Sequence, residues 1–128
     1  MIIIPGQPFP KERPRYKKDV GISYTPPKSK AVEKDIGILY TVQGGEKIEG
    51  PVSIDLKFYL KKPKKPKYDE PLKRPDMDNL IKTVLDALNG IAYDDDKQIV
   101  RISAEKHWAE DQPRTEISVK SYQNIVNF

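Results

Sequence analysis

The sequence predicts a small α/β domain of the α+β kind, with elements in the order β-α-β-α-β-β. Residues 51–60 alternate apolar and polar side chains with a period of two, which is typical of a half-buried strand. Residues 76–88 instead place apolar side chains at helical spacing along one face. A chain of 128 residues is long enough for one core, so we expect a single domain over residues 1–128, a mixed sheet with helices packed on it.

The first part of the chain predicts a short strand, a surface arm and a helix. Residues 2–4 are β-branched and are followed by a Pro-Gly turn, which predicts the first strand. Residues 7–27 carry prolines and basic side chains without a helical period, and we expect an extended surface arm there. Between residues 29 and 43 apolar side chains recur at helical spacing until two glycines interrupt them, which predicts a helix.

The middle of the chain predicts a basic loop and a second helix. The loop, residues 61–75, holds seven basic residues and four prolines, which deny it both helix and ladder hydrogen bonds. We expect this basic loop to be mobile. The second helix follows, with Asp76 as its N-cap, and it ends before Asn89 and Gly90, a pair that favours a left-handed backbone.

The last part of the chain predicts two strands. Residues 98–105 and 115–122 each show the alternation of a strand. Because only a short turn at 109–113 separates them, we expect these two strands to pair with each other as a hairpin.

Composition limits both the chemistry and the location of the protein. The chain has no cysteine, which excludes disulfide bonds, thiolate zinc sites and cysteine nucleophiles, so we expect any metal to be held by oxygen. No segment approaches the roughly 20 apolar residues of a membrane span, and we expect a soluble, cytoplasmic protein that does not contact membranes. The net charge of +4 favours an anionic partner. Only 37% of the residues are apolar, so we expect a homo-oligomer in which a second subunit covers part of the surface.

Aspartates bracket the second helix. Asp76 and Asp78, the first-turn pair, lie at its start, and residues 94–96, the acidic triplet, follow its end. Either aspartate of the first-turn pair alone is explained by the helix dipole. The helix is about 20 Å long and residues 90–96 can span about 23 Å, so a segment that runs back along the helix would bring the triplet to the first-turn pair. Three carboxylates in one pocket repel one another unless a cation neutralises them, which predicts a Mg²⁺ or Mn²⁺ site that includes Asp95 or Asp96.

A lysine beside such a site suits the hydrolysis of a phosphate ester. A metal lowers the pKa of a bound water and polarises a phosphate oxygen, while the Lys82 ammonium would offset charge that builds up in the transition state. Taken alone, Lys82 would be interpreted as a solvent-facing lysine paired with Asp78 or Asp86. The lone His107 is expected to be an exposed or edge histidine outside the site.

Two basic segments, one near the N-terminus and one in the basic loop, predict a phosphate-rich polymer as the substrate. Lysine and arginine contacts to phosphates give binding that is independent of base sequence and sensitive to salt. A run of charges alone is more often a solvated face, and the acidic cluster beside it is what favours a nucleic acid. The expected phosphate contacts are Lys11, Arg13, Arg15, Lys64, Lys65, Lys67, Lys73 and Arg74.

The stretch RPDMDNLIKTVLDALNG, residues 74–90, followed by AYDDDKQIV, residues 92–100, closely resembles the RusA-type Holliday junction resolvases. The core of that family reads roughly D-x-D-N-L-x-K and then D-D-x-Q-V. The segments PGQPFPKERPRY and YTPP are also similar to segments common in the family. Carried over by position, the family's catalytic, metal-binding acids correspond to Asp76, Asp78 and Asp96. Asp95 matches the other member of the acidic pair, and Lys82 matches the catalytic lysine.

The resemblance implies a RusA-like fold and a Mg²⁺-dependent homodimeric endonuclease. Such an enzyme nicks opposed strands of a four-way DNA junction in recombination and repair, is often encoded by a prophage, and needs no small-molecule cofactor beyond the metal. Two other functions stay open. One is a non-catalytic protein that binds junctions or duplex DNA, and the other is a nuclease for other branched or single-stranded nucleic acids.

Overall fold

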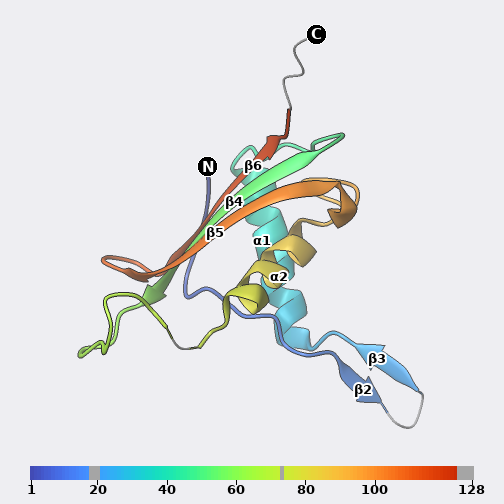
Figure 1. Cartoon of the computed structure of the whole chain (residues 1–128). Helices are drawn as coiled ribbons and strands as arrows, with labels where there is room; N and C mark the ends of the chain where they lie inside the picture. Colours follow the sequence, from blue (N-terminus) through green and yellow to red (C-terminus); the bar gives the residue numbers. More distant parts are fainter. Residues whose placement is uncertain (18–20, 73, 124–128) are drawn as a thin grey trace.

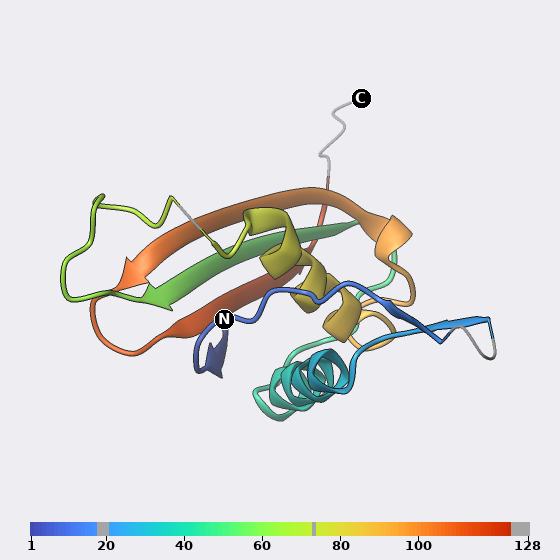
Figure 2. The same ribbon diagram turned by 90° about the horizontal axis from the view of Figure 1, so that it is seen from below.

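The computed structural model describes residues 1–17, 21–72 and 74–123. Its main sheet contains the strands β1 (Ile2–Pro5), β4 (Val52–Lys61), β5 (Ile99–Ala109) and β6 (Arg114–Ser121). Two helices, α1 (Pro27–Val42) and α2 (Met77–Leu88), pack on one face of this sheet (Figure 1, Figure 2). A short 3-10 helix, η1 (Asp96–Gln98), leads into β5. The predicted α+β class, with a mixed sheet and helices packed on it, is confirmed.

Strand β4 lies at the centre of the core because every second side chain along it is apolar. Its inward-facing side chains are at most 1% exposed: Val52, Ile54, Leu56, Phe58 and Leu60. Helix α2 buries its apolar stripe against this strand, and α1 adds Ile36 and Tyr40 to the same cluster. The strand and the second helix were therefore predicted to within two residues at each end.

The predicted hairpin between the last two strands is wrong. The strand order is β1-β6-β4-β5, so β4 lies between β5 and β6 and pairs with both, in parallel with β5 and antiparallel with β6. The reason is the crossover: a strand, a helix and a following strand place β5 beside β4 in parallel, which leaves the other edge of β4 for β6. The connection at residues 110–113 passes the end of β4 (Figure 2), and four residues reach about 13 Å, more than two strand spacings of about 4.8 Å.

The N-terminal arm is more ordered than the sequence predicts. Its described part contains a second, two-stranded sheet in which β2 (Arg15–Lys17) pairs antiparallel with β3 (Ile22–Tyr24). This hairpin projects beyond the start of α1 (Figure 1). The sequence analysis predicted an extended surface arm but not this pairing, in which cross-strand hydrogen bonds satisfy the backbone of two short segments.

Helix α2 ends where the sequence predicts. Gly90 has a φ of 81°, a backbone conformation that glycine adopts without strain, and this residue turns the chain out of the helix. Within the three described ranges, no helix is both long enough and apolar enough to cross a bilayer.

Candidate functional site

The start of α2 presents acidic and basic side chains to solvent. The apolar stripe of the helix faces the sheet, and beside it Asp78 and Lys82 are exposed, as is Asp76 directly before the helix. The Asp76 side chain makes no capping hydrogen bond, and one oxygen of Asp78 accepts the backbone N–H of Asn79 at 3.0 Å. Throughout the described ranges no ion pair involves Lys82, so the pair between Lys82 and Asp78 or Asp86 is not made. These groups face solvent, where an external ligand can reach them.

Two neighbouring segments hold the start of α2 in place. The Lys106 ammonium of β5 donates to the backbone carbonyl of Pro75 at 3.0 Å, directly before Asp76. On the other side, the backbone N–H of Lys11 donates to the carbonyl of Asn79 at 2.9 Å. The first turn of the helix is therefore fixed to the sheet and to the N-terminal arm, which positions the first-turn pair.

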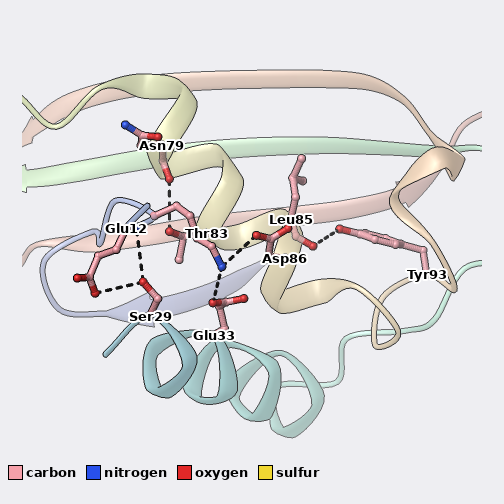
Figure 3. Close-up of polar contacts among 9 residues, drawn as sticks. Glu12, Ser29, Glu33, Asn79, Thr83, Leu85, Asp86 and Tyr93 are labelled. Atoms are coloured by element: carbon pink, nitrogen blue, oxygen red, sulfur yellow. Dashed lines mark hydrogen bonds and ion pairs between the residues drawn. The ribbon is translucent and has the colours of Figure 1, made fainter. Parts of the chain in front are cut away.

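The acidic triplet lies beyond the other end of α2, and the segment before it does not run back along the helix as expected. The N–H of Gly90 donates to the carbonyl of Tyr93 at 2.8 Å, so the chain turns tightly directly after the helix. The Tyr93 hydroxyl then donates to the carbonyl of Leu85 at 2.7 Å and fastens this turn to the last part of α2 (Figure 3). A calculation of chain length limits how far a segment can reach, but not the path that it takes.

The triplet is anchored beside the start of β5. Asp95 caps η1 by accepting the N–H of Lys97 at 2.9 Å, and the Gln98 side chain donates to the carbonyls of Ile48 and Gly50. Asp94 pairs with Lys47 at 2.6 Å. Figure 1 and Figure 2 show the chain entering β5 directly from η1.

Asp95 and Asp96 influence each other's protonation. The pKa of Asp95 is lowered, first by the backbone N–H of Lys97 and then by a hydrogen bond with the Asp96 carboxyl. The pKa of Asp96 is raised, first by the Asp95 carboxyl, and the charge of Asp86 adds to the effect. Two carboxyl groups in contact compete for one proton, a conflict that a cation would relieve.

The carboxylates of the site fit a hard divalent cation by their chemistry, but one chain does not assemble them into a single cluster. Oxygen ligands are those that Mg²⁺ and Mn²⁺ prefer. In the part of the chain that the structure describes, no group of three or more His, Cys, Asp or Glu side chains is close enough to hold a metal. The first-turn pair and the pair Asp95–Asp96 thus each offer an incomplete set of ligands.

The structure gives Lys11 a contact between the two helices, and its expected contact with DNA stays a prediction. Its ammonium pairs with Glu33 of α1 at 2.9 Å and with Asp86 of α2 at 3.2 Å, and its side chain is 10% exposed. Figure 3 shows these ion pairs between the two helices. Burial alone would lower the pKa of Lys11, but the hydrogen bonds to Glu33 and Asp86 outweigh it and raise the pKa. Sequence alone cannot distinguish a lysine that joins two helices from one that faces DNA.

The other basic residues divide into two groups. Arg13, Lys64, Lys65, Lys67 and Arg74 are exposed and available for contacts with phosphates. Of Arg15 only the backbone, in β2, is described, and Lys73 lies outside the described residues.

The end of β5 holds the basic loop, and the sequence analysis missed these contacts. Trp108 donates from its indole N–H to the carbonyl of Tyr68 at 3.1 Å, and His107 lies between Glu70 at 2.9 Å and Glu105 at 2.8 Å. The hydrogen bond to Glu105 raises the pKa of His107; burial opposes it, and Glu70 adds to it. Residues 106–108 therefore contact the segment 68–75 at three points. The only signal in the sequence was a His-Trp pair near the end of a strand, and this pair alone does not indicate which residues it contacts.

Two comparisons with known proteins relate the chain to a family and to a bacterial protein. Residues 5–120 match the family described as Endodeoxyribonuclease RusA. Over 85 residues the chain is 39% identical to a protein of Bacillus subtilis (strain 168) described as uncharacterized protein YqaN. That match covers 57% of this chain and 59% of the relative, so the chain spans less than two thirds of that protein's length.

Proposed function

The chain belongs to the RusA endodeoxyribonuclease family, and from that premise we propose that it is a metal-dependent endonuclease that resolves four-way DNA junctions by paired nicking. The observation that carries the proposal is the start of α2, where Asp76, Asp78 and Lys82 are exposed together on a helix turn that β5 and the N-terminal arm hold in place. Groups that act on a phosphodiester must be held in a fixed geometry, and they are most precise when a helix or strand carries them.

The chain's own residues divide the work. The first-turn pair and Asp95–Asp96 would hold a Mg²⁺ or Mn²⁺ ion, which when bound lowers the pKa of water and polarises a phosphate oxygen. The Lys82 ammonium offsets negative charge that develops on the phosphate. The exposed lysines of the basic loop bind the sugar-phosphate backbone beside this site.

A homodimer is part of the proposal. Two opposed strands of a junction have to be nicked, and two copies provide two sites. Since one chain leaves its two acidic pairs apart, a second copy can also supply the pair that the first lacks. Mixing Asp78→Asn with Asp96→Asn protein tests this point, because activity recovers in mixed dimers only where each site takes one pair from each copy.

A nicking assay on a synthetic four-way junction with Mg²⁺ or Mn²⁺ tests the activity. We expect Asp78→Asn to abolish cleavage and Lys82→Ala to slow it about 10²- to 10³-fold, as removal of a charge-stabilising group does. The matched controls are Asp35→Asn and Lys34→Ala, exposed residues of α1 that make no ion pair within the described ranges, and both should cut at the wild-type rate.

Three outcomes would overturn the proposal or redirect it. Cleavage by Asp78→Asn at the wild-type rate would exclude the site. Binding without cleavage, insensitive to divalent metal, would identify a non-catalytic junction or duplex binder. Equal cleavage of junction, duplex and single strand would identify a nuclease of other nucleic acids.

A further inference from the structure

The Gln98 side chain holds the turn that carries the acidic triplet. Its carbonyl oxygen accepts the backbone N–H of Asp94 at 2.8 Å and that of Asp95 at 3.1 Å. Its amide nitrogen donates to the backbone carbonyl of Ile48 at 3.1 Å and to that of Gly50 at 3.0 Å. A glutamine amide has two N–H donors and two acceptor lone pairs, so these four hydrogen bonds use its whole capacity. The amide is therefore fixed in one orientation.

These hydrogen bonds attach the turn to a segment that is far away in the chain. Gln98 is 50 residues from Ile48 and 48 residues from Gly50, in the loop that leads into β4. The N–H of Ile48 also donates to the carbonyl of Ala92 at 2.8 Å, directly before the turn. Because β4 is the buried central strand of the sheet, the turn is anchored to the most rigid part of the fold.

The carboxyl groups of the turn stay open to solvent while its backbone is held. Asp95 and Asp96 are exposed, whereas Gln98 is half-buried. The Asp95 carboxyl accepts the N–H of Lys97, and Gln98 accepts the N–H of Asp95, which together form a capping box around η1. Carboxylates that a fixed backbone presents to solvent need little rearrangement to bind a cation.

We propose that Gln98 is a positioning residue for a divalent cation and that it holds Asp95 and Asp96 in the arrangement that binds Mg²⁺ or Mn²⁺. All its hydrogen-bonding atoms are engaged, so it acts through the two carboxylates and not as a ligand. The inference rests on the proposed function for the role of these carboxylates as metal ligands. Groups that orient the ligands of a metal change its affinity by about 10- to 100-fold.

Binding of Mn²⁺ to the full chain without DNA tests the proposal directly. Gln98→Met keeps the length of the side chain and removes all four hydrogen bonds. We expect its dissociation constant for Mn²⁺, measured by electron paramagnetic resonance of the free ion, to rise about 10- to 100-fold. Asp96→Asn should weaken binding at least as much, which shows that the measured ion is the one at this acidic pair.

Gln98→Glu separates positioning from charge. Its carboxylate can still accept the N–H groups of the turn, but it has no donor for the carbonyls of Ile48 and Gly50. If only local charge mattered, the added negative charge would strengthen the binding of Mn²⁺. The proposal predicts the opposite, a dissociation constant about tenfold higher, because the turn loses its attachment to the loop before β4. This variant decides the question if Gln98→Met does not fold.

Gln43→Met is the matched control. The Gln43 side chain also bonds to the backbone, accepting the N–H of Ile3 at 2.9 Å and donating to its carbonyl at 2.7 Å. These bonds lie at the β1 edge of the main sheet, opposite the β5 edge. Thermal melting should show that both methionine variants lose stability, while only Gln98→Met loses affinity for Mn²⁺. A purely structural role would not produce this difference.

A nicking assay at increasing Mn²⁺ concentration gives a second readout. For both Gln98 variants the half-saturating concentration of Mn²⁺ should rise. The rate at saturating Mn²⁺ should stay within about threefold of the wild-type rate, because the first-turn pair and Lys82 are unchanged.

The binding measurement distinguishes failure of this inference from failure of the proposed function. If the wild type cleaves no junction but Gln98→Met still binds Mn²⁺ more weakly, the inference stands and the function falls. If the wild type cleaves junctions and a folded Gln98 variant binds Mn²⁺ as tightly as the wild type or more tightly, only the inference is overturned. It is overturned as well if the wild type binds no Mn²⁺, if Asp96→Asn binds it unchanged, or if neither Gln98 variant folds.

Discussion

Replacing Lys11 by methionine tests whether this lysine joins the two helices or contacts DNA. The substitution keeps an aliphatic side chain and removes the ammonium, which in the wild type pairs with Glu33 and Asp86. In the variant these two carboxylates face each other across the gap between α1 and α2 without a cation. The structure therefore predicts a loss of stability and no loss of affinity for DNA.

The size of the loss follows from the burial of the partners. Removing one member of a fully buried ion pair costs about 3–5 kcal/mol. Because the Asp86 side chain is 34% exposed and the Glu33 side chain 18%, water screens the carboxylates that remain, and we expect about 2 kcal/mol. With an unfolding entropy of about 2.1 cal/mol/K per residue, the melting temperature of the 128-residue chain should fall by about 7 °C.

Urea unfolding measures the free energy, and fluorescence anisotropy with a labelled four-way junction measures the affinity. The matched control is Lys30→Met, an exposed lysine of α1 that makes no ion pair in the described ranges, and it should change stability by less than about 0.5 kcal/mol. The reasoning is refuted if Lys11→Met is as stable as the wild type, or if the folded variant loses affinity for the junction.

Two further contacts near the start of α2 can be tested. Lys106→Met removes the hydrogen bond to the Pro75 carbonyl, and we expect hydrogen exchange at residues 77–80 to quicken about fivefold, a local loss of about 1 kcal/mol; unchanged exchange would contradict the anchoring role. The pKa of His107 is raised in the folded state, so its contribution to stability is complete below its unfolded pKa of about 6.5 and is lost as pH rises through the folded value. Thermal melting between pH 5 and 9 should therefore show a decline of at most about 1 kcal/mol that His107→Gln abolishes, and a variant with the same decline as wild type would exclude His107 as its source.

The sequence predicts an element well when the apolar pattern within that element alone determines which face is buried. The alternation from Val52 to Leu60 and the apolar stripe of α2 are complete within each segment, so periodicity alone places them. The stop at Gly90 is equally local, because it depends on one backbone conformation.

Strand pairing could not be predicted in the same way. The turn between β5 and β6 is short enough for a hairpin, and nothing in either strand forbids one. Which strands pair depends on the crossover from β4 through α2. This crossover places β5 parallel to β4 and leaves the other edge of β4 for β6. This is a property of the whole chain rather than of either strand.

The sequence indicates which residue types form the candidate site, but not where all of them lie in space. Asp78 and Lys82 lie on one flank of α2 because they are four residues apart, and Asp76 directly precedes the helix. The ion pairs of Lys11 were missed because its partner Glu33 is 22 residues away in the chain, a separation at which a basic run gives no information about ion pairs. The place of Asp95 and Asp96 was missed for the same reason, since hydrogen bonds to the distant residues Ile48 and Gly50 hold the segment there.

The location of bound Mn²⁺ tests the central claim most directly. Anomalous scattering from crystals grown with Mn²⁺ should show an ion about 2.1 Å from a carboxylate oxygen of Asp76 or Asp78, with Asp95 or Asp96 of the same or a second copy completing its ligands. The account is contradicted if the ion binds away from both acidic pairs, or if no ion binds at a Mn²⁺ concentration that supports cleavage of a four-way junction.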